Sequence, residues 1–93
     1  MKPPDVLSVY TLTELGRACV ELRDIRPVGR LANGATEWEA RVTYYGGGEL
    51  IGEGRWGGDG FEAPVPQLLP DVDASSAAAS RLEREVRRAL AQY

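Results

Sequence analysis

The sequence predicts an α+β fold: an antiparallel three- to four-stranded β-meander with a long C-terminal helix packed on one face and a short N-terminal helix or strand. Two patterns indicate this. Residues 37–65 alternate apolar and polar side chains between glycine-rich turns, and residues 74–92 repeat apolar residues at helical spacing. The chain has 93 residues, of which 43% are hydrophobic and 27% charged, which suits one small core. We therefore expect residues 1–93 to form a single domain.

The N-terminal segment contains a helix signal. Residues 1–5 include Pro3-Pro4 and are expected to form an extended lead-in, because paired prolines disfavour helix. Thr11 and Glu14 then have the spacing of a capping box, in which two side chains satisfy free amides at the start of a helix. The apolar residues that follow at helical spacing favour a short helix over residues 12–22. They are Leu12, Leu15, Cys19 and Leu22.

The same segment also contains a strand signal. Gly16 costs about 1 kcal/mol relative to alanine inside a helix, and residues 18–23 alternate apolar and polar side chains as a strand does. We expect a short helix that gives way to a strand near Val20 and runs towards Arg26. Whether residues 12–25 are helix or strand stays open at this point.

The clearest strand covers residues 37–45. Pro27 and Gly29 are expected to end the preceding element, and Asn33-Gly34 is a dipeptide typical of turns. In the strand, a period of two holds over the whole run, so one face should be core and the other should meet water or a partner. The core-facing residues are Trp38, Ala40, Val42 and Tyr44.

Two further strands should complete the meander. After a reversal at 46–48, residues 49–56 should form a second strand. On one face of this strand, Leu50 is followed by two glycines and a tryptophan. Glycine weakens a strand unless a large neighbour needs the space, and we expect the side chains of Trp38 and Tyr44 to fill it. The residues sharing that face are Leu50, Gly52, Gly54 and Trp56.

A third strand should follow the turn at 57–60 and include Phe61, Ala63 and Val65. Pro64 and Pro66 cannot donate hydrogen bonds to a neighbouring strand, so this strand belongs at the edge of the sheet.

The C-terminal helix is the most strongly patterned element. Asp73 or Ser75 can cap a helix that runs to about Gln92. One stripe of apolar residues should pack on the sheet. It consists of Ala78, Leu82, Val86, Ala89, Leu90 and Tyr93.

The composition argues against catalysis. The chain has no histidine and one cysteine, whereas histidine is the usual general base and the commonest metal ligand. We expect no enzymatic activity, no metal and no cofactor. Cys19 is expected to be a small core residue. A lone cysteine forms no internal disulfide, so a reducing compartment, the cytoplasm, is expected. No apolar run has the length of a signal peptide or of a membrane span.

A protein partner is the expected ligand. The water-facing side of the meander carries tyrosine and charged residues, which suit an interface, together with Thr43 and Ile51. A small acidic domain fits an inhibitor or adaptor, including the kind that phages and mobile elements carry against host defence. A homodimer is a third possibility. The candidate partner-binding residues are Tyr45, Arg41, Glu39, Glu53, Arg55 and Trp56.

Nucleic-acid binding is the alternative hypothesis. Arg81, Arg84 and Arg88 lie on the expected helix, but the net charge of −3 disfavours binding to phosphates through overall charge. The expected order helix, three strands, helix and the glycine-spaced segment Gly48–Gly54 resemble a double-stranded RNA-binding domain. That family carries a lysine cluster at the start of its final helix. Here the equivalent positions are Asp71, Asp73, Ser75 and Ser76.

Overall fold

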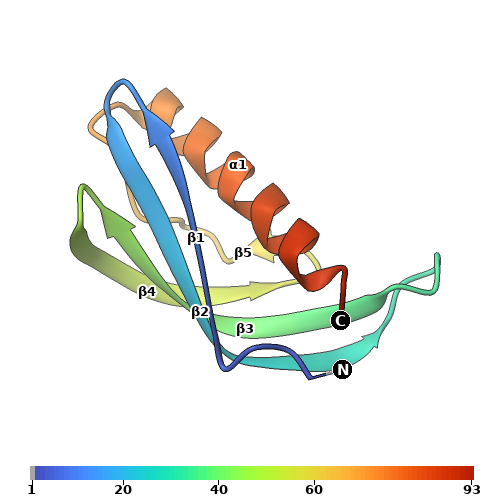
Figure 1. The fold of residues 1–93 in the computed structure, drawn as a ribbon. Coiled ribbons are helices and arrows are strands. Elements are labelled where there is room, and N and C mark those ends of the chain that lie inside the picture. The colour runs from blue at the N-terminus through green and yellow to red at the C-terminus, as the bar shows by residue number, and fades with distance from the viewer. Residues whose placement is uncertain (1) are drawn as a thin grey trace.

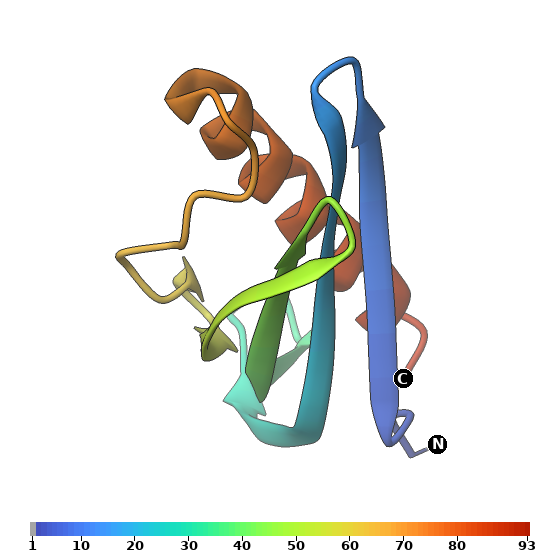
Figure 2. The same cartoon turned by 90° about the vertical axis from the view of Figure 1, so that its left-hand side faces the viewer.

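The α+β prediction is confirmed. The computed structural model describes residues 2–93 and contains one five-stranded antiparallel sheet, ordered as the strands occur in the chain, and one helix. The sheet is curled, and the helix lies across its inner side (Figures 1 and 2). The elements are β1 (Val6–Thr13), β2 (Gly16–Arg30), β3 (Thr36–Gly46), β4 (Glu49–Gly57), β5 (Gly60–Phe61) and α1 (Val72–Leu90).

The predicted N-terminal helix is wrong, because β1 and β2 form a β-hairpin. Thr13 pairs with Gly16 across a tight turn. Gly16 has a φ of 132°, which only glycine adopts readily. The Thr13 hydroxyl accepts a hydrogen bond from the amide of Leu15 and donates one to the carbonyl of Gly16. Local turn chemistry therefore replaces the capping box. The likeness to the RNA-binding domain, which needs a first helix, also fails. Met1 of the expected lead-in lies outside the described residues.

Strand β2 continues beyond the expected stop at Pro27 and Gly29. Its pairing with β3 shifts register between Arg23 and Arg26 and again after Pro27. Asp24, at the first shift, has a φ of 53°, in the left-handed region that aspartate tolerates better than most residues. Irregular pairing of this kind bends a strand without ending it, so β2 carries on into the turn at 31–35.

The predictions for β3 and its flanking turns are confirmed. Trp38, Ala40, Val42 and Tyr44 are all buried and face the helix. The turn before β3 uses Asn33-Gly34, and the side-chain oxygen of Asn33 accepts a hydrogen bond from the amide of Ala35. The turn after β3 contains two glycines with positive φ. The alternation of apolar and polar side chains was therefore sufficient to predict this strand.

Strand β4 contains a bulge that changes which residues face outward. Tyr44 pairs with Gly52, whereas Tyr45 pairs with Leu50, so Ile51 is the extra residue. Leu50 therefore faces outward, with 60% of its surface exposed. Ile51 packs against the core. The predictions for both residues were wrong, because perfect alternation had been assumed through the bulge.

The glycines of β4 do leave space for larger groups. A Cβ at Gly54 would lie 3.3 Å from the ring of Tyr44, as expected for large against small packing. A Cβ at Gly52 would meet the ring of Pro66 at 2.8 Å instead. Gly52 thus accommodates the segment that follows the sheet, which the sequence did not indicate.

The predicted third strand is much shorter than expected. Strand β5 ends at Phe61, before Pro64 and Pro66. Because neither proline can donate to a ladder, the chain leaves the sheet here. It then crosses the inner side, where Leu68 and Leu69 enter the core.

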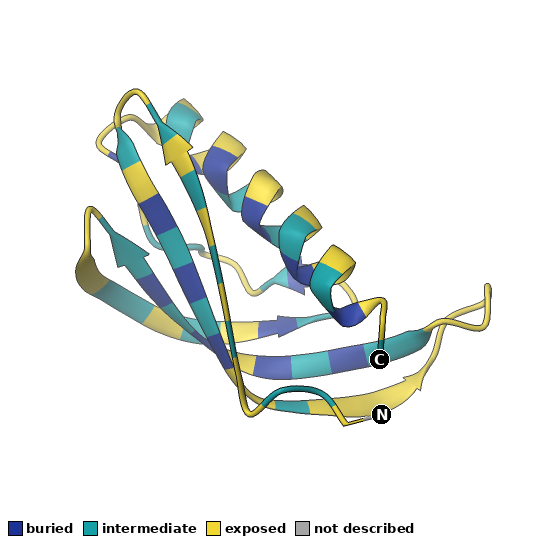
Figure 3. Ribbon diagram, viewed as in Figure 1, coloured by how far each residue is buried: buried dark blue, intermediate teal, exposed yellow. Residues whose placement is uncertain are grey.

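Helix α1 buries most of its predicted apolar stripe. The stripe and the inner strand faces form one core, visible in Figure 3 as buried positions repeating along β2, β3 and α1. No helix within residues 2–93 combines the length and the apolar character that crossing a membrane requires. The buried apolar residues of α1 are Ala78, Leu82, Val86 and Leu90.

The cap of α1 differs from the prediction. Asp71, not Asp73 or Ser75, occupies the N-cap, and its carboxylate accepts a hydrogen bond of 2.8 Å from the amide of Ala74. Ser75 is buried, and its hydroxyl accepts a hydrogen bond of 2.6 Å from the amide of Leu68. Ser75 therefore ties the crossing segment to the helix.

Replacing Asp71 by alanine should lower the free energy of unfolding by about 1 kcal/mol, because an amide at the helix start loses its acceptor. The matched variant Asp73→Ala removes only a favourable charge in the first turn and should cost about 0.3–1 kcal/mol at low salt. Urea unfolding followed by circular dichroism measures both. A larger loss for Asp73→Ala would contradict the assignment of the cap.

Candidate functional site

The face of the sheet turned away from α1, here called the outer face, is not covered by any element within residues 2–93 (Figure 1). Four of its side chains are direct neighbours across β1, β2, β3 and β4. They form the aromatic row: Tyr10, Cys19, Tyr45 and Leu50. Tyr10 and Leu50 are each 60% exposed, and Leu12 beside them is 67% exposed. Most exposed aromatic and apolar groups of the outer face thus lie at one end, whereas Val6, 39% exposed, lies at the other end beside Arg23.

Two charged rows follow the aromatic row along the strands, at a spacing of about 6–7 Å set by two strand residues. The glutamate row consists of Ser8, Glu21, Thr43 and Glu53. The arginine row, one step further, consists of Arg23, Arg41 and Arg55. The outer face therefore changes from apolar to acidic to basic along the strands.

The ion pairs on this face lie in water. Arg23 contacts Glu21 at 2.7 Å and Arg41 contacts Asp24 at 3.2 Å, with both arginine side chains more than half exposed. Arg26 also pairs with Glu39. Exposed pairs of this kind contribute about 0–1 kcal/mol to folding, so folding alone gives little reason for this arrangement.

Most of the predicted partner-binding residues lie together on the outer face. Tyr45, Arg41, Glu53 and Arg55 belong to the three rows, and Glu39 lies on the same side near the bend of β2. Trp56 is the exception: it faces α1 and is only 3% exposed. Its choice as a partner-binding residue is therefore wrong, because its side chain lies in the core, on the face where the predicted alternation of β4 also placed it.

Tyr10, Leu12 and Arg23 were missed by the sequence reasoning. The prediction placed Leu12 in a short helix, Tyr10 ahead of it and Arg23 in a strand beyond Val20, so it did not bring the three residues onto one face. A usable signal was present, since the run Val6–Thr13 is rich in valine, threonine and tyrosine, all of which favour strands.

Cys19 lies on the outer face and not in the core as predicted, because Ala18 and Val20 take the inward positions. Partial burial raises the pKa of its thiol; the nearby Arg17 opposes this and Glu21 adds to it. A raised pKa lowers the thiolate fraction at neutral pH, which does not favour a role as nucleophile. The Arg17 guanidinium lies 5.9 Å from the centre of the Tyr10 ring, a cation–π contact that helps to hold that ring in place.

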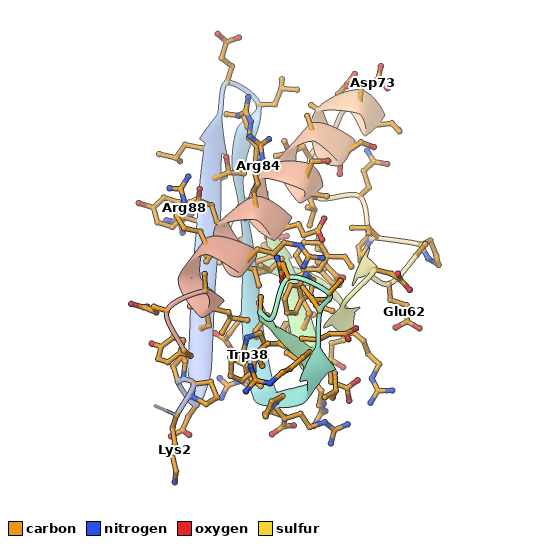
Figure 4. All side chains as sticks on the ribbon, turned by 90° about the vertical axis from the view of Figure 1, so that its right-hand side faces the viewer. Lys2, Trp38, Glu62, Asp73, Arg84 and Arg88 are labelled. Carbon is orange, nitrogen blue, oxygen red and sulfur yellow. The ribbon has the colours of Figure 1, made fainter. Side chains whose placement is uncertain are left out.

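The helix arginines lie on the opposite side of the molecule. Arg81, Arg84 and Arg88 are exposed on α1, and Figure 4 shows Arg84 and Arg88 along it. Glu85 lies 3.5 Å from Arg88. Arg87 has a structural role, since it donates to the carbonyl of Gly58 at 3.0 Å and lies over the Trp56 ring at 5.3 Å. The alternative site thus consists of exposed arginines interleaved with glutamates.

A cavity of about 520 Å³ opens at the C-terminal end of α1, between the turn before β3 and the turn after β4. Three aromatic residues line it together with Glu37 and Arg87. The indole N–H of Trp56 is buried without a hydrogen-bond partner in the described structure. The charged side chains that line the cavity include both acidic and basic residues, and Glu37 and Arg87 form no ion pair with each other. The aromatic residues are Trp38, Trp56 and Tyr93.

Comparisons with models of protein families, with curated proteins and with solved structures give no significant match. The function must therefore be inferred from the chemistry of the surfaces described above.

Proposed function

We propose that this protein is a non-enzymatic binding module that holds a different protein on its outer face and acts as an inhibitor or adaptor in the cytoplasm. The aromatic row carries this proposal. Tyr10 and Leu50, each 60% exposed, stand at the two ends of a row that crosses four strands through Cys19 and Tyr45, and they expose apolar area that a partner would cover. Tyrosine is also enriched among the residues that dominate binding energy.

The rigidity of the site supports binding. The row lies on hydrogen-bonded strands whose opposite faces are packed in the core, and even Leu50, beside the bulge of β4, keeps its pairing with Tyr45, so the side chains keep their spacing without a partner. A preorganised surface loses less conformational entropy on association. Burial of Tyr45 and Cys19 to intermediate levels further restricts their side chains.

A second copy of the chain stacked about an axis along the strands does not fit this surface. If two copies stacked their outer faces about a two-fold axis along the strands, each row would face itself. Arginine would then meet arginine and glutamate would meet glutamate, and juxtaposed like charges disfavour association. A partner with the complementary order of apolar, basic and acidic groups avoids this conflict.

Capture from a bacterial lysate, with two double variants, tests the proposal. The variant Tyr10→Ser/Leu50→Ser removes apolar area from the aromatic row, whereas Leu31→Ser/Val72→Ser removes exposed apolar area elsewhere. We expect the wild type and the second variant to retain one protein in stoichiometric amount. The first should bind it at least about thirtyfold more weakly, because even one residue that dominates an interface contributes about 2 kcal/mol or more.

Cys19 provides a second readout on the purified complex. Its thiol lies inside the aromatic row, so a bound partner should slow its alkylation, measured at alkaline pH because burial raises the thiol pKa. Equal alkylation rates with and without partner, or equal capture by both double variants, would exclude the outer face as the binding site. Light scattering measures the oligomeric state. If the wild type were a dimer and Tyr10→Ser/Leu50→Ser a monomer, the ligand of the outer face would be a second copy of the chain.

A further inference from the structure

The arginine row places like charges opposite one another. Arg23 is the direct partner of Arg41, and Arg41 is the direct partner of Arg55. Directly opposed residues on neighbouring strands lie about 4.5–5.5 Å apart at their Cα atoms, and like charges in this position destabilise a sheet. A face that only needed to be soluble would be better served by alternating arginine and glutamate. The row thus calls for an anionic group that is not part of the described chain.

Neighbouring acids satisfy the row only in part. Glu21 contacts Arg23 and Asp24 contacts Arg41, whereas Arg55 makes no ion pair within residues 2–93. Each guanidinium carries five donors, and a carboxylate can accept two of them side by side. The side chains of Arg23 and Arg41 are 57% and 72% exposed, so donors remain accessible to an incoming carboxylate.

We propose that the arginine row binds an acidic segment of the partner protein through its Asp and Glu carboxylates. This inference rests on the proposed function and names the chemistry of the partner at one end of the interface. The row spans three strands, about 10 Å from Arg23 to Arg55, which matches two or three carboxylates of a short peptide segment.

The neighbouring rows favour an acidic peptide over a nucleic acid. Glu21 and Glu53 stand one step from the arginines, and the aromatic row stands beyond them. A strand of nucleic acid running from the tyrosines to the arginines would bring its phosphates against both glutamates. The net charge of −3 adds a repulsion at longer range. A protein surface can reverse its charge over this distance, and a phosphate backbone cannot.

A titration of the isotope-labelled full chain with a synthetic hexaglutamate peptide, followed by nuclear magnetic resonance, tests the inference. We expect shifts at the amides and guanidinium groups of Arg23, Arg41 and Arg55. Binding should weaken severalfold between about 50 mM and about 300 mM salt, because the contacts are exposed charge pairs.

A matched pair of triple variants makes the test specific. Arg23→Gln/Arg41→Gln/Arg55→Gln should weaken peptide binding about tenfold. Arg81→Gln/Arg84→Gln/Arg88→Gln changes the net charge equally on the other side and should leave binding nearly unchanged. Circular dichroism verifies that both variants fold. Equal weakening in both, or shifts confined to α1, would overturn the inference.

A parallel titration with a single-stranded oligonucleotide of the same total charge tests nucleic-acid binding as the alternative. Tighter binding of the oligonucleotide at the same arginines would replace the acidic peptide with a nucleic acid. Failure of the peptide to bind, while lysate capture still depends on Tyr10 and Leu50, would remove this inference and leave the proposed function standing. Peptide binding without any captured protein would support the affinity of the arginine row for carboxylates and count against the protein partner of the proposed function.

Discussion

Replacing Leu82 by alanine is expected to lower the free energy of unfolding by about 2–5 kcal/mol. Leu82 lies at the centre of the stripe of α1 that faces the sheet and has no exposed surface. Its loss removes apolar contacts and leaves a cavity that the packed neighbours fill only partly. Alanine is the best helix former, so the helix itself loses nothing. Since a domain of this size is stable by about 5–15 kcal/mol, the variant should melt roughly 10–40 °C lower.

The matched variant is Leu50→Ala, which makes the same chemical change on the outer face. Leu50 is 60% exposed, and surface substitutions of this kind usually change stability by less than about 0.5 kcal/mol. Differential scanning calorimetry compares the two. Similar melting temperatures for both variants would mean that α1 does not pack on the sheet as described. The same Leu50 variant should weaken partner binding. Substitution on the inner face thus changes stability, whereas substitution on the outer face changes binding.

A methyl group added at Gly46 should destabilise the fold by about 2–3 kcal/mol, the upper part of the usual range of about 1–3 kcal/mol for overpacking. A Cβ at this position would overlap the carbonyl oxygen of Leu68 and lie 3.3 Å from its carbonyl carbon. Both atoms belong to the backbone of the segment that crosses the sheet, so no side-chain rotation relieves the clash. Leu68 is also held by its hydrogen bond to Ser75 and by its burial in the core.

Gly57→Ala is the control for Gly46→Ala. Gly57 ends β4, and a Cβ there would lie 4.0 Å from the nearest atoms, at ordinary contact distance. Neither glycine has a positive φ, so the two variants differ in available space and not in backbone strain. Denaturant unfolding should show a loss of about 2 kcal/mol or more for the first and little change for the second. If Gly46→Ala were as stable as the wild type, residues 62–71 could not pack against Gly46 as described.

The elements with strong local patterns could be predicted from the sequence. In β3, alternation put Trp38 and Tyr44 on the inner face, and in α1 the helical repeat put Leu82 and Val86 there. Both patterns are set by backbone periodicity within one segment, so no distant contact is needed to read them. The turn at Asn33-Gly34 was likewise predicted from the conformational freedom of the residues that form it.

The N-terminal hairpin and the bulge could not be predicted in this way. The residues around Leu12 and Leu15 carry signals for both a helix and a strand, and β2 is a strand because it pairs with both β1 and β3. The bulge at Ile51 cannot be recognised from the alternation of apolar and polar residues. One extra residue moves the side chains on one side of the bulge to the opposite face of the sheet. Tertiary pairing outweighs local preference in segments of this kind.

The sequence by itself determined the fold class, the inner faces of β3 and α1, and part of the candidate interface, including Tyr45, Arg41 and Arg55. The tertiary structure alone decided that Tyr10 lies in the same row as Tyr45, across Cys19, and that Arg23 completes a row of like charges. The reason is physical: side-chain periodicity is a property of one segment, whereas a row across a sheet depends on the register between strands far apart in the chain.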